Sequence, residues 1–484
     1  MNRKKLQMGC AAALAVYLLS AVLFYWIAGE QLHFRVEETA AVTPAQPIGE
    51  LVQGMEVRQP FTAQCDEVTG VMLRLSTYGR TNTCRLIVSL LDGEGSVLAQ
   101  QILAGEDIED GALQKVFFAQ PVRVDRGKWY AVVLASPDGT PGNAVTVWQG
   151  NTISAARTEI PVEIPAGQEL LIDGAPQWGM LHVTVQTRSH MQFGAFYWYW
   201  AAGGGALLAC YCGYLLYAVG KGKDVLILRV ISAFRRYGYL MRQLIARDFK
   251  TKYKRSVLGI LWSFLNPLLT MAVQYVVFST IFRSDIPNFP LYLLTGIVCF
   301  NFFSEASSMA LQSIVGNASL ITKVYVPKYI YPVSRVLSST VNLLLSLIPL
   351  LAVMLLTDTP VRPAILLLPF GLVCLVVFSI GVGFILSTAM VFFRDTQFLW
   401  GVVSMLWMYL TPIIYPESII PAQFMTLYKC NPLYHIIRFI RIVLMDGISP
   451  EPKAYGLCMI ASVVPFLIGA VIFKKNQDKF VLNL

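Results

Sequence analysis

Residues 248–268 read DFKTKYKRSVLGILWSFLNPL, a basic segment that runs directly into an apolar one. With Arg247 just upstream, its cations are Lys250, Lys252, Lys254 and Arg255. Soluble proteins rarely place so many cations against the start of a buried helix, whereas cations beside an apolar span are typical of the cytoplasmic side of a membrane. The stretch therefore predicts a point at which the chain enters a membrane.

The composition of the whole chain is that of an integral membrane protein. Hydrophobic residues make up 55% of the 484 residues, charged residues only 14%, and the mean hydropathy is +0.57, whereas soluble domains carry about 25% charged residues. The net charge of +9 comes from cations that flank apolar runs, so the positive-inside rule explains it better than nucleic-acid binding. Residues 30–188 differ, with 19 acidic and 11 basic side chains.

The first 220 residues are expected to form two membrane spans around an all-β domain. Residues 1–29 place MNRKK before an apolar run of roughly 20 residues, long enough to span a bilayer, and predict an uncleaved first helix. Residues 30–192 show short alternating strands between turn signals, which predicts an antiparallel β-sandwich, with a jelly-roll form as the first expectation. Residues 193–220 predict a second span, which would leave residues 30–192 outside the cell.

The cysteines of the β domain are Cys65 and Cys84. Outside the cell they would either pair or remain two free thiols. No Cys/His spacing along the chain predicts a metal site, so we expect no bound metal.

Residues 221–255 predict an amphipathic helix at the cytoplasmic interface, because apolar residues recur at steps of three or four with arginines between them. A simple linker helix in contact with lipid is the alternative. The apolar positions are Val230, Phe234, Tyr237, Met241, Leu244 and Ile245.

Residues 256–484 predict a mostly α-helical core of six further spans. They are expected near residues 256–282, 290–312, 333–356, 363–390, 397–416 and 453–473. Alternating sides make both termini cytoplasmic and leave Lys429, Arg438, Arg441 and Lys453 outside, against the positive-inside rule. The external segment 417–452 includes an apolar stretch too short and too charged to span, and predicts a re-entrant piece, with a helix lying flat on the surface as the alternative.

Four blocks of this core resemble, in the right order, the membrane subunits of polysaccharide ABC exporters. These are the ABC-2 type permeases for O-antigen, teichoic acid and capsule-like glycans. The resemblance runs from about Leu240 to Leu484 and leaves the front half of the chain without a counterpart. The blocks are RDFKTKYKRSVLGILWSFLNPL, FPLYLLTGIVCFNFFSEASSMALQSIVGNASLITKVYVPKYIYPVSRVLSS, FFRDTQFLWGVVSMLWMYLTPIIYPESIIP and NPLYHIIRFIR.

The resemblance implies a homodimer of permeases on two separate ATPase subunits. Such a complex would move a lipid-linked polysaccharide from the cytoplasmic side to the outer face of a bacterial cell membrane. ATP and Mg²⁺ would bind to the ATPase, because the sequence GKGK at 220–223 lacks the spacing and the hydroxyl residue of a phosphate-binding loop. We therefore expect a transporter subunit, not an enzyme, with membrane lipids and no nucleic acid as further partners.

The basic stretch is expected to act as a gate for the substrate. Cations attract the phosphate or pyrophosphate of a lipid-linked glycan through charge-assisted hydrogen bonds. Attraction to anionic lipids, about 1 kcal/mol per cation, is the alternative. The candidate gate residues are Arg242, Arg247, Lys250, Tyr253, Lys254 and Arg255.

Aromatic residues in the spans are expected to line the conduit, since sugar rings present C–H faces that pack on aromatic planes. For each of them, core packing or lipid contact is the alternative. Glu305 is included because ionisable groups inside membranes are costly and often functional, although it would also fit the inner interface. The candidate lining residues are Trp262, Phe264, Phe300, Phe302, Phe303, Glu305, Trp407 and Tyr409.

Two loops are expected to carry partner contacts or gating. The loop 316–332 resembles the one that holds the coupling helix, which rests on the ATPase in similar permeases; Asn317 or Ser319 is expected to cap this helix and Pro327 to stop it. Its candidate residues are Asn317, Leu320, Lys323, Val324, Tyr325 and Pro327. In the external segment the candidate gate residues are Asn431, Pro432 and Arg438.

The β domain leaves its role open. It would bind the emerging glycan, act as a spacer, or dock a wall-assembly enzyme. The candidate stacking residues are Trp129, Tyr130, Trp148 and Trp178. Two other functions stay as alternatives for the whole chain: a membrane glycosyltransferase or polymerase, for which no paired-carboxylate pattern is evident, and a membrane-anchored carbohydrate-binding protein, which leaves six spans unexplained.

Overall fold

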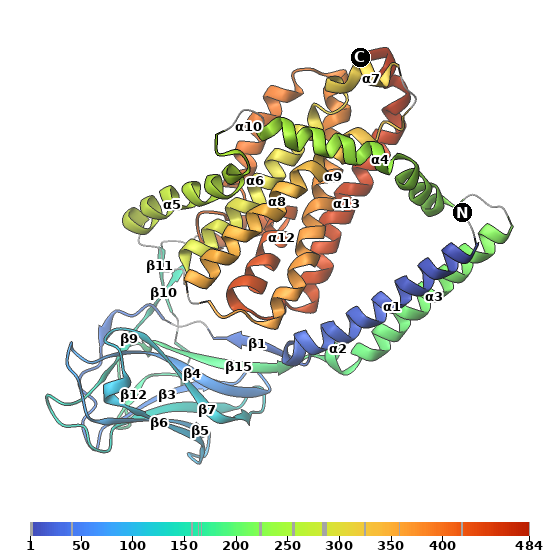
Figure 1. The fold of residues 1–484 in the computed structure, drawn as a ribbon. Coiled ribbons are helices and arrows are strands. Elements are labelled where there is room, and N and C mark those ends of the chain that lie inside the picture. Colours follow the sequence, from blue (N-terminus) through green and yellow to red (C-terminus); the bar gives the residue numbers. More distant parts are fainter. Residues whose placement is uncertain are drawn as a thin grey trace. The chain divides into compact units, whose positions relative to one another are not determined.

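The computed structural model describes residues 3–39, 42–155, 158–162, 164–165, 167–221, 225–253, 257–282, 288–323, 326–357, 359–417 and 420–483. The chain divides into two compact units. One, the helical unit, comprises Met1–Gln31 and Phe196–Leu484, and the other, the β unit, comprises Leu32–Ala195. Figure 1 shows helices throughout the first and strands throughout the second.

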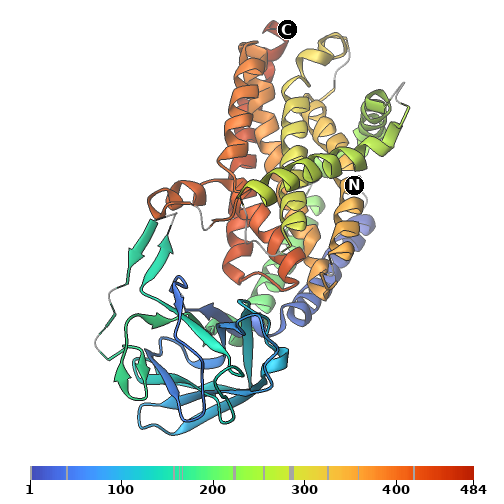
Figure 2. The same ribbon diagram turned by 90° about the vertical axis from the view of Figure 1, so that its left-hand side faces the viewer.

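The β unit contains two antiparallel sheets. The first joins β1 (Phe34–Glu38), β15 (Val183–His190), β4 (Glu67–Ser76), β9 (Thr146–Gly150) and β14 (Met180–Leu181), with β2 (Gln46–Pro47) on β9 and β7 (Leu113–Arg123) on β4. The second joins β13 (Ala175–Pro176), β12 (Leu171–Ile172), β3 (Glu56–Thr62), β8 (Trp129–Ala135), β5 (Arg85–Asp92) and β6 (Val97–Ala104). A separate hairpin of β10 (Thr152–Ala155) and β11 (Thr158–Pro161) projects from them (Figure 2).

One hydrophobic core holds the two sheets together. Along β5, Leu86, Val88 and Leu90 are fully buried, as the period of two in the sequence predicts. They share a core with Leu73 of β4 and Val147 of β9 from the other sheet. The all-β prediction for this region is confirmed, while the jelly-roll form stays a prediction.

The two cysteines of the β unit are both buried and both free. Cys65 and Cys84 lie in the same hydrophobic core without a bond between them. Of the two alternatives that the sequence left open, the structure therefore has two thiols and not a disulfide.

Among the described residues, seven helices are long and apolar enough to cross a membrane. They are α1 (Arg3–Ala28), α3 (Tyr197–Gly220), α5 (Trp262–Phe282), α6 (Phe289–Leu311), α8 (Ile330–Leu356), α9 (Leu368–Phe392) and α13 (Pro452–Asn476). The predicted span at 397–416 needs correction, because α10 (Thr396–Tyr409) has only 14 residues. That length is about 21 Å, shorter than the hydrocarbon core of about 30 Å.

The chain after α10 turns and forms two short helices before α13. These are α11 (Ala422–Lys429) and α12 (Pro432–Arg441), the latter followed by a π-helical turn over Ile442–Asp446. Most of the side chains of α12 are buried, and Phe439 and Ile440 pack on Gly371 of α9. Most of α12 thus packs against protein, and the re-entrant placement of this segment stays a prediction.

Small residues allow close helix contacts within the helical unit. A Cβ atom added at Gly469 of α13 would lie 2.2 Å from the carbonyl oxygen of Gly381 on α9. In the α1/α3 pair, a Cβ at Gly204 would lie 2.4 Å from the hydroxyl of Tyr17, which donates a hydrogen bond to the Ala201 carbonyl at 2.8 Å. Close backbone approach at small residues is the usual way in which helices associate in lipid.

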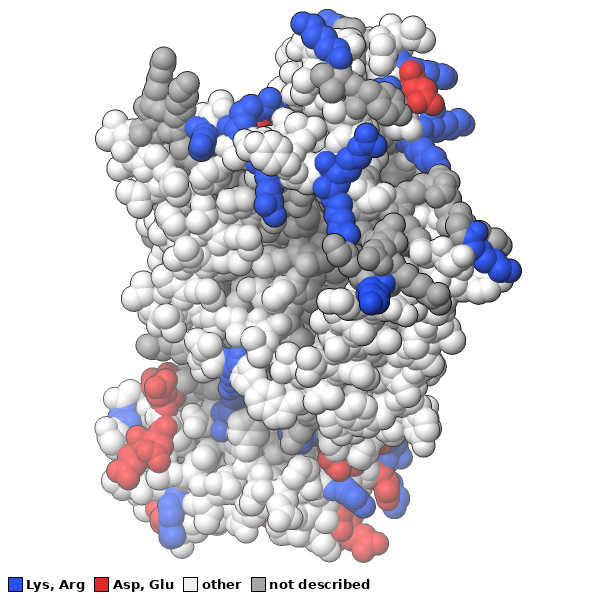
Figure 3. Space-filling model, turned by 45° about the vertical axis from the view of Figure 1, so that its right-hand side comes forward, with Lys and Arg blue, Asp and Glu red and all other residues white. Residues whose placement is uncertain are grey.

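The charges and aromatic residues of the helical unit mark its two ends. Lys and Arg side chains gather at the end where α4, α7 and the carboxyl terminus lie (Figure 3); among the exposed ones are Lys250, Lys323 and Lys474. The opposite end of the α1/α3 pair carries exposed aromatic residues, which are Trp26, Trp198, Tyr199 and Trp200. Cations at one end and an aromatic belt at the other are typical of a protein that spans a membrane.

His182 lies half-buried between β14 and β15. Its Nδ1 contacts the carbonyl oxygen of Val42. Burial, together with repulsion from Arg74, lowers the pKa of His182 below its ordinary value. The folded unit therefore favours the neutral imidazole.

We predict that the β unit loses stability as the pH falls below the ordinary histidine pKa of about 6.5. Below that pH the unfolded chain binds the proton more readily than the folded one, so protonation favours unfolding. Amide hydrogen exchange of β14 and β15 in the full chain, corrected for intrinsic rates, should accelerate from about pH 7.5 to pH 5.5. His182→Asn should lose most of this acceleration and His190→Asn should keep it; equal behaviour of the two variants would contradict the assignment.

Candidate functional site

Helix α4 (Leu226–Tyr253) carries the first cations of the basic stretch, up to Lys252, and packs on the helical unit itself. Met241 and Leu244 are buried, and Tyr237, Leu240 and Ile245 are partly buried in the same cluster. The cluster includes residues of α8, α9 and α13, across which α4 runs (Figure 1). The amphipathic pattern is confirmed, but this apolar face meets protein, where the sequence predicted the membrane interface. The side chains of Val230 and Phe234 lie outside the described part.

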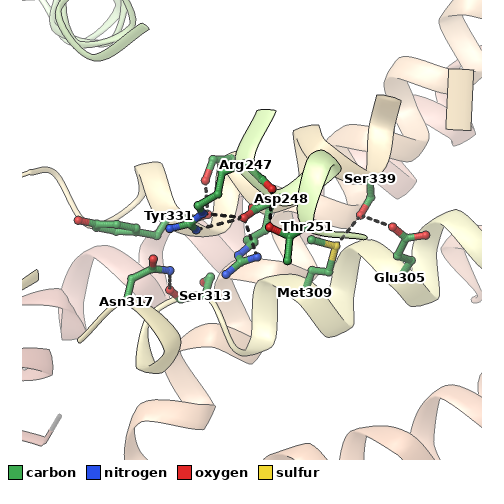
Figure 4. A network of polar contacts seen from close by, with 11 residues as sticks. Arg247, Asp248, Thr251, Glu305, Met309, Ser313, Asn317, Tyr331 and Ser339 are labelled. Carbon is green, nitrogen blue, oxygen red and sulfur yellow. Dashed lines mark hydrogen bonds and ion pairs between the residues drawn. The ribbon is translucent and has the colours of Figure 1, made fainter. Parts of the chain in front are cut away.

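A buried carboxylate ties α4 to α8. The side chain of Asp248 is 4% exposed, and its Oδ1 lies 3.1 Å from Arg247 Nη2 and 3.1 Å from Arg335 Nη1 (Figure 4). Its other oxygen, Oδ2, is buried and has no hydrogen-bond partner among the described residues. Sequence reasoning did not single out Asp248 or Arg335, because their contact depends on α4 lying across the start of α8.

Glu305 of α6 contacts the same two helices, α4 and α8. Lys252 Nζ lies 2.8 Å from Oε2 of Glu305, Asn342 donates to Oε1 at 2.8 Å, and Ser339 donates to Oε1 at 3.4 Å. The carboxylate side chain is 29% exposed. Glu305 therefore bridges the end of α4 to α8.

These two carboxylates line adjoining pockets, which together we call the polar furrow. The larger, of about 750 Å³, is lined by Arg247, Asp248, Thr251, Lys252, Glu305, Met309, Gly316, Asn317 and Arg335. The smaller, of about 280 Å³, is lined by Lys252, Trp262, Ser263, Asn266, Pro267, Val298, Asn301, Phe302, Glu305, Ser339, Asn342, Leu343 and Ser346. Lys252 and Glu305 belong to both pockets, so their ion pair stands where the two meet.

A proline inside α5 shapes the smaller pocket. Pro267 has no N–H, so the carbonyl of Ser263 four residues earlier loses its helical donor. The hydroxyl of Ser346 on α8 lies 3.2 Å from that carbonyl and 3.0 Å from the backbone carbonyl of Asn342, and donates to both. A freed backbone group in a membrane helix must be satisfied within protein, and here this requirement fixes α5 against α8.

The structure brings only part of the predicted substrate gate to the furrow. Arg247 lines it, and Arg242 and Lys250 are exposed on α4 without lining it. Lys252, from the same basic stretch, does line it. The side chain of Tyr253, and Lys254 and Arg255, lie outside the described residues.

The predicted aromatic lining divides between furrow and core. Trp262 and Phe302 line the smaller pocket, and Phe264 of α5 is half-buried. Phe300 and Phe303 are buried, and Phe303 stacks on Phe378 at 5.3 Å between ring centroids. The structure thus corrects the expectation for these two residues, because their contacts are those of the protein core.

Helix α10 carries the other two predicted lining residues. The Trp407 ring contacts Phe303 at 5.2 Å and, with Asn431 and Pro432, lines a separate pocket of about 270 Å³. Tyr409 is exposed. Neither residue lines the polar furrow.

Asn431 holds the turn between α10 and α12. Its Oδ1 accepts hydrogen bonds from Trp407 Nε1 at 2.9 Å and from the Leu433 N–H at 3.1 Å. Its Nδ2 donates to the Leu410 carbonyl at 3.2 Å and to Thr411 Oγ1 at 2.9 Å. Asn431 is thus the cap of α12, and Pro432 occupies the first helical turn, where a missing N–H costs nothing.

Two of the cations that the predicted topology leaves outside are arginines of α12, and both have partners within the protein. Arg438 lies 3.8 Å from Glu417, which also accepts a hydrogen bond from Tyr434 at 2.9 Å. Arg441 is buried and donates to the carbonyls of Pro412 at 2.6 Å, Ile413 at 3.1 Å and Tyr292 at 3.2 Å. Because its guanidinium serves backbone acceptors, its position is set by packing and not by the positive-inside rule.

The loop 316–332 contains a helix of only four residues, α7 (Ala318–Ile321). Asn317 does not cap it; its Nδ2 donates to the Ser313 carbonyl at 2.7 Å. Pro327 lies several residues beyond the end of α7, and its carbonyl accepts from Ile330 at 3.1 Å as α8 begins. Leu320 and Ile321 pack into the cluster beneath α4, while Lys323 is exposed. Val324 and Tyr325 lie outside the described residues.

The four aromatic candidates of the β unit do not form one site. Trp129 and Trp178 are exposed, whereas Tyr130 is buried and its hydroxyl accepts a hydrogen bond from the Asp125 N–H at 2.9 Å. The Nε1 of Trp148 is buried without a described partner. A pocket of about 550 Å³ opens between the sheets, and none of the four residues lines it.

We predict that Arg441→Met strongly destabilises the helical unit. The substitution removes the donor of three buried carbonyls, and breaking such a buried polar cluster costs about 3 kcal/mol or more. The thermal unfolding midpoint of the purified chain in lipid nanodiscs would measure the loss. Arg438→Met is the matched control one turn away: its exposed ion pair should contribute about 1 kcal/mol or less. Similar midpoints for the two variants would contradict the role of Arg441.

We also predict that Asp248→Asn loosens α4 more than Glu305→Gln does. The Asp248 carboxylate is almost fully buried between two arginines, so its loss should cost about 3 kcal/mol, against about 1 kcal/mol for the more exposed Glu305. Amide hydrogen exchange across residues 241–253 is the measurement. Faster exchange in Glu305→Gln than in Asp248→Asn would show that the order is wrong.

Comparison with known proteins places this geometry in a family. Residues 239–445 match the family described as ABC-2 type transporter. The chain is 31% identical over 249 residues to the O-antigen export system permease protein RfbA of Klebsiella pneumoniae, covering 50% of this chain and 95% of the relative. It is 27% identical over 260 residues to RfbA of Myxococcus xanthus, covering 53% of this chain and 100% of the relative.

The name of a third relative refers to a different polysaccharide. The polysialic acid transport protein KpsM of Escherichia coli is 25% identical over 259 residues, covering 52% of this chain and 99% of the relative. Capsule export proteins of Haemophilus influenzae are more distant. Since these relatives align along nearly their whole length, this multi-pass membrane protein belongs to the ABC-2 type transporter family, among the permeases of polysaccharide ABC exporters.

Proposed function

We propose that this chain forms the transmembrane path of an ATP-driven exporter that moves a lipid-linked polysaccharide from the cytoplasmic to the outer face of a bacterial membrane. The observation that carries the proposal is the polar furrow, which begins at the basic end of α4 and continues between α5, α6 and α8. A hydrogen-bonding surface at membrane depth is costly unless it serves a polar cargo or a partner. The relatives named for O-antigen and polysialic acid support a glycan as that cargo.

The larger pocket of the furrow is proposed to receive the phosphate of the lipid carrier. Arg247 and Arg335 supply two cations to it, beside the ion pair of Lys252 and Glu305. Asp248 pairs with both arginines, so an arriving phosphate competes with this carboxylate for donors that are already in place. Arg242, Lys250, Lys254 and Arg255 are proposed to attract the anion from the surrounding lipid surface.

The proposed orientation puts both termini and α4 in the cytoplasm, with α10 and the segment after it together completing the crossing between α9 and α13. The cations at the α4 end of the helical unit support that side as the inside, and the aromatic belt of α1 and α3 fits the outer interface. The chain then leaves the membrane after α1 and returns at α3, which puts residues 30–192 outside. The exposed Trp129 and Trp178 suit a carbohydrate-binding role for this domain.

Two surfaces of the helical unit are proposed to meet partners. On α5 and α10, apolar side chains such as Val273, Val276 and Val402 are more than half exposed, and a second copy of the chain is proposed to cover them. On the cytoplasmic side, the loop with α7 is proposed to dock on a separate ATPase subunit, because its apolar residues anchor it and Lys323 points outward. ATP and Mg²⁺ would bind to that subunit.

The direct test is reconstitution of the chain with its partner ATPase in liposomes that contain a fluorescent lipid-linked oligosaccharide. We expect ATP-dependent appearance of the sugar on the face opposite to the ATPase, measured by lectin accessibility. Arg247→Gln should raise the half-saturating concentration of the glycolipid about tenfold or less, by loss of a charge-assisted hydrogen bond. Arg235→Gln, an exposed arginine of the same helix that lines neither pocket of the furrow, is the matched control.

Two results would contradict the proposal. Sugar transfer or polymerisation by the chain without ATP or partner would favour the enzyme alternative. Translocation that proceeds equally with an ATPase unable to hydrolyse ATP would exclude an ATP-driven exporter.

A further inference from the structure

The smaller pocket of the polar furrow contains two carboxamides with unused hydrogen-bonding capacity. Asn266 of α5 and Asn301 of α6 both line it, both are exposed, and neither makes a hydrogen bond to another residue in the described part of the chain. A carboxamide offers two donors and an acceptor with two lone pairs. Two such groups facing one pocket match a ligand that presents neighbouring hydroxyls, each of which donates and accepts.

The remaining walls of the pocket are neutral or already paired. At its inner end, Lys252 and Glu305 form an ion pair of 2.8 Å, and Asn342 donates to the same carboxylate. The other lining residues are uncharged. A ligand carboxylate or phosphate would have to take Lys252 from Glu305 and leave that acid unpaired, which costs free energy in a partly buried site.

The size and shape of the pocket limit the ligand further. Its volume of about 280 Å³ lies at the lower end for small-molecule sites. Trp262 stands at the edge, 44% exposed, and offers a flat apolar face beside the amides. An aromatic plane for C–H groups and amides for hydroxyls together fit one saccharide ring.

We propose that this pocket is a binding site for one uncharged sugar unit, with Asn266 and Asn301 as its hydrogen-bonding residues and Trp262 as its stacking face. The inference deepens the proposed function and rests on it, since it names the chemistry of the cargo at one point of the path. Charged groups of the cargo bind in the larger pocket, beside Arg247 and Arg335, and the two pockets are separated by the Lys252–Glu305 pair.

The fold explains why the two amides meet. Asn266 directly precedes Pro267, so it lies in the segment of α5 that Ser346 holds against α8. Asn301 lies one turn before Glu305 on α6 and shares its face. The pocket therefore depends on a local break in α5 and on the helical period of α6.

The test is direct binding of simple sugars to the full chain in lipid nanodiscs, without ATP. Saturation-transfer difference NMR would follow methyl mannoside and methyl N-acetylglucosaminide as neutral probes, glucuronate as an acidic probe, and a short prenyl phosphate. We expect binding of at least one neutral glycoside and weaker binding of glucuronate. Asn266→Leu and Asn301→Leu should each raise its dissociation constant about three- to tenfold, the cost of one or two hydrogen bonds. Asn483→Leu, far along the chain on α14 (Phe480–Asn483), should leave it unchanged.

Several results would overturn this assignment. They are equal affinity in wild type and both pocket variants, tighter binding of glucuronate than of neutral glycosides, or binding of the prenyl phosphate alone. Because both asparagines are exposed, neither substitution opens a core cavity, and unchanged unfolding midpoints would confirm that the fold is intact. Sugar binding without ATP-driven transport would contradict the proposed exporter function but not the sugar site. ATP-driven transport with unchanged kinetics in both variants would contradict the sugar site but not the exporter function.

Discussion

The backbone carbonyls freed where membrane helices break set the architecture of this protein. Lipid supplies no donor, so each freed carbonyl needs one from the protein. At the break after α10, the carbonyls of Pro412 and Ile413 receive it from Arg441, whose guanidinium also lies 3.4 Å from the centre of the Tyr292 ring. At Pro267, Ser346 of the neighbouring helix supplies it. Both breaks therefore become points where helices are fixed together.

The polar furrow follows from the second of these breaks. Because α5 is fixed to α8 at Ser263, polar side chains of α5, α6 and α8 face one pocket. The basic end of α4 lies beside this pocket. Two carboxylates, Asp248 and Glu305, pair with cations of this region. The anion and sugar sites that we propose both lie in this furrow.

The β unit obeys a different physical rule. Its two sheets are held by side chains that alternate along each strand and meet in one apolar core. Its pocket of about 550 Å³ lies among residues such as Gln59, Phe61, Val132 and Thr187 and involves none of the exposed tryptophans. The aromatic residues that sequence reasoning offered as candidates for sugar stacking, one of several open roles, are thus either scattered on its surface or part of its core.

The sequence by itself determined the class and the order of the parts. Apolar runs of sufficient length identify membrane helices, period-two alternation identifies the β region, and the basic amphipathic pattern identifies α4, because each depends only on local spacing. Four blocks in order were enough to indicate the family. Local spacing overestimated the length of α10, because hydrophobicity does not show where a helix ends. Here a buried arginine binds the carbonyls that the helix end leaves free.

Only the tertiary structure decided which residues form the site. Asp248 and Arg335 are 87 positions apart in the sequence, as their numbers show, and meet because α4 crosses the start of α8. Phe303 and Trp262 are both aromatic residues in predicted spans, yet one is in the core and the other edges the furrow. Residue type does not distinguish these fates; the rotation of each helix about its axis does, and that rotation is set by packing with distant segments.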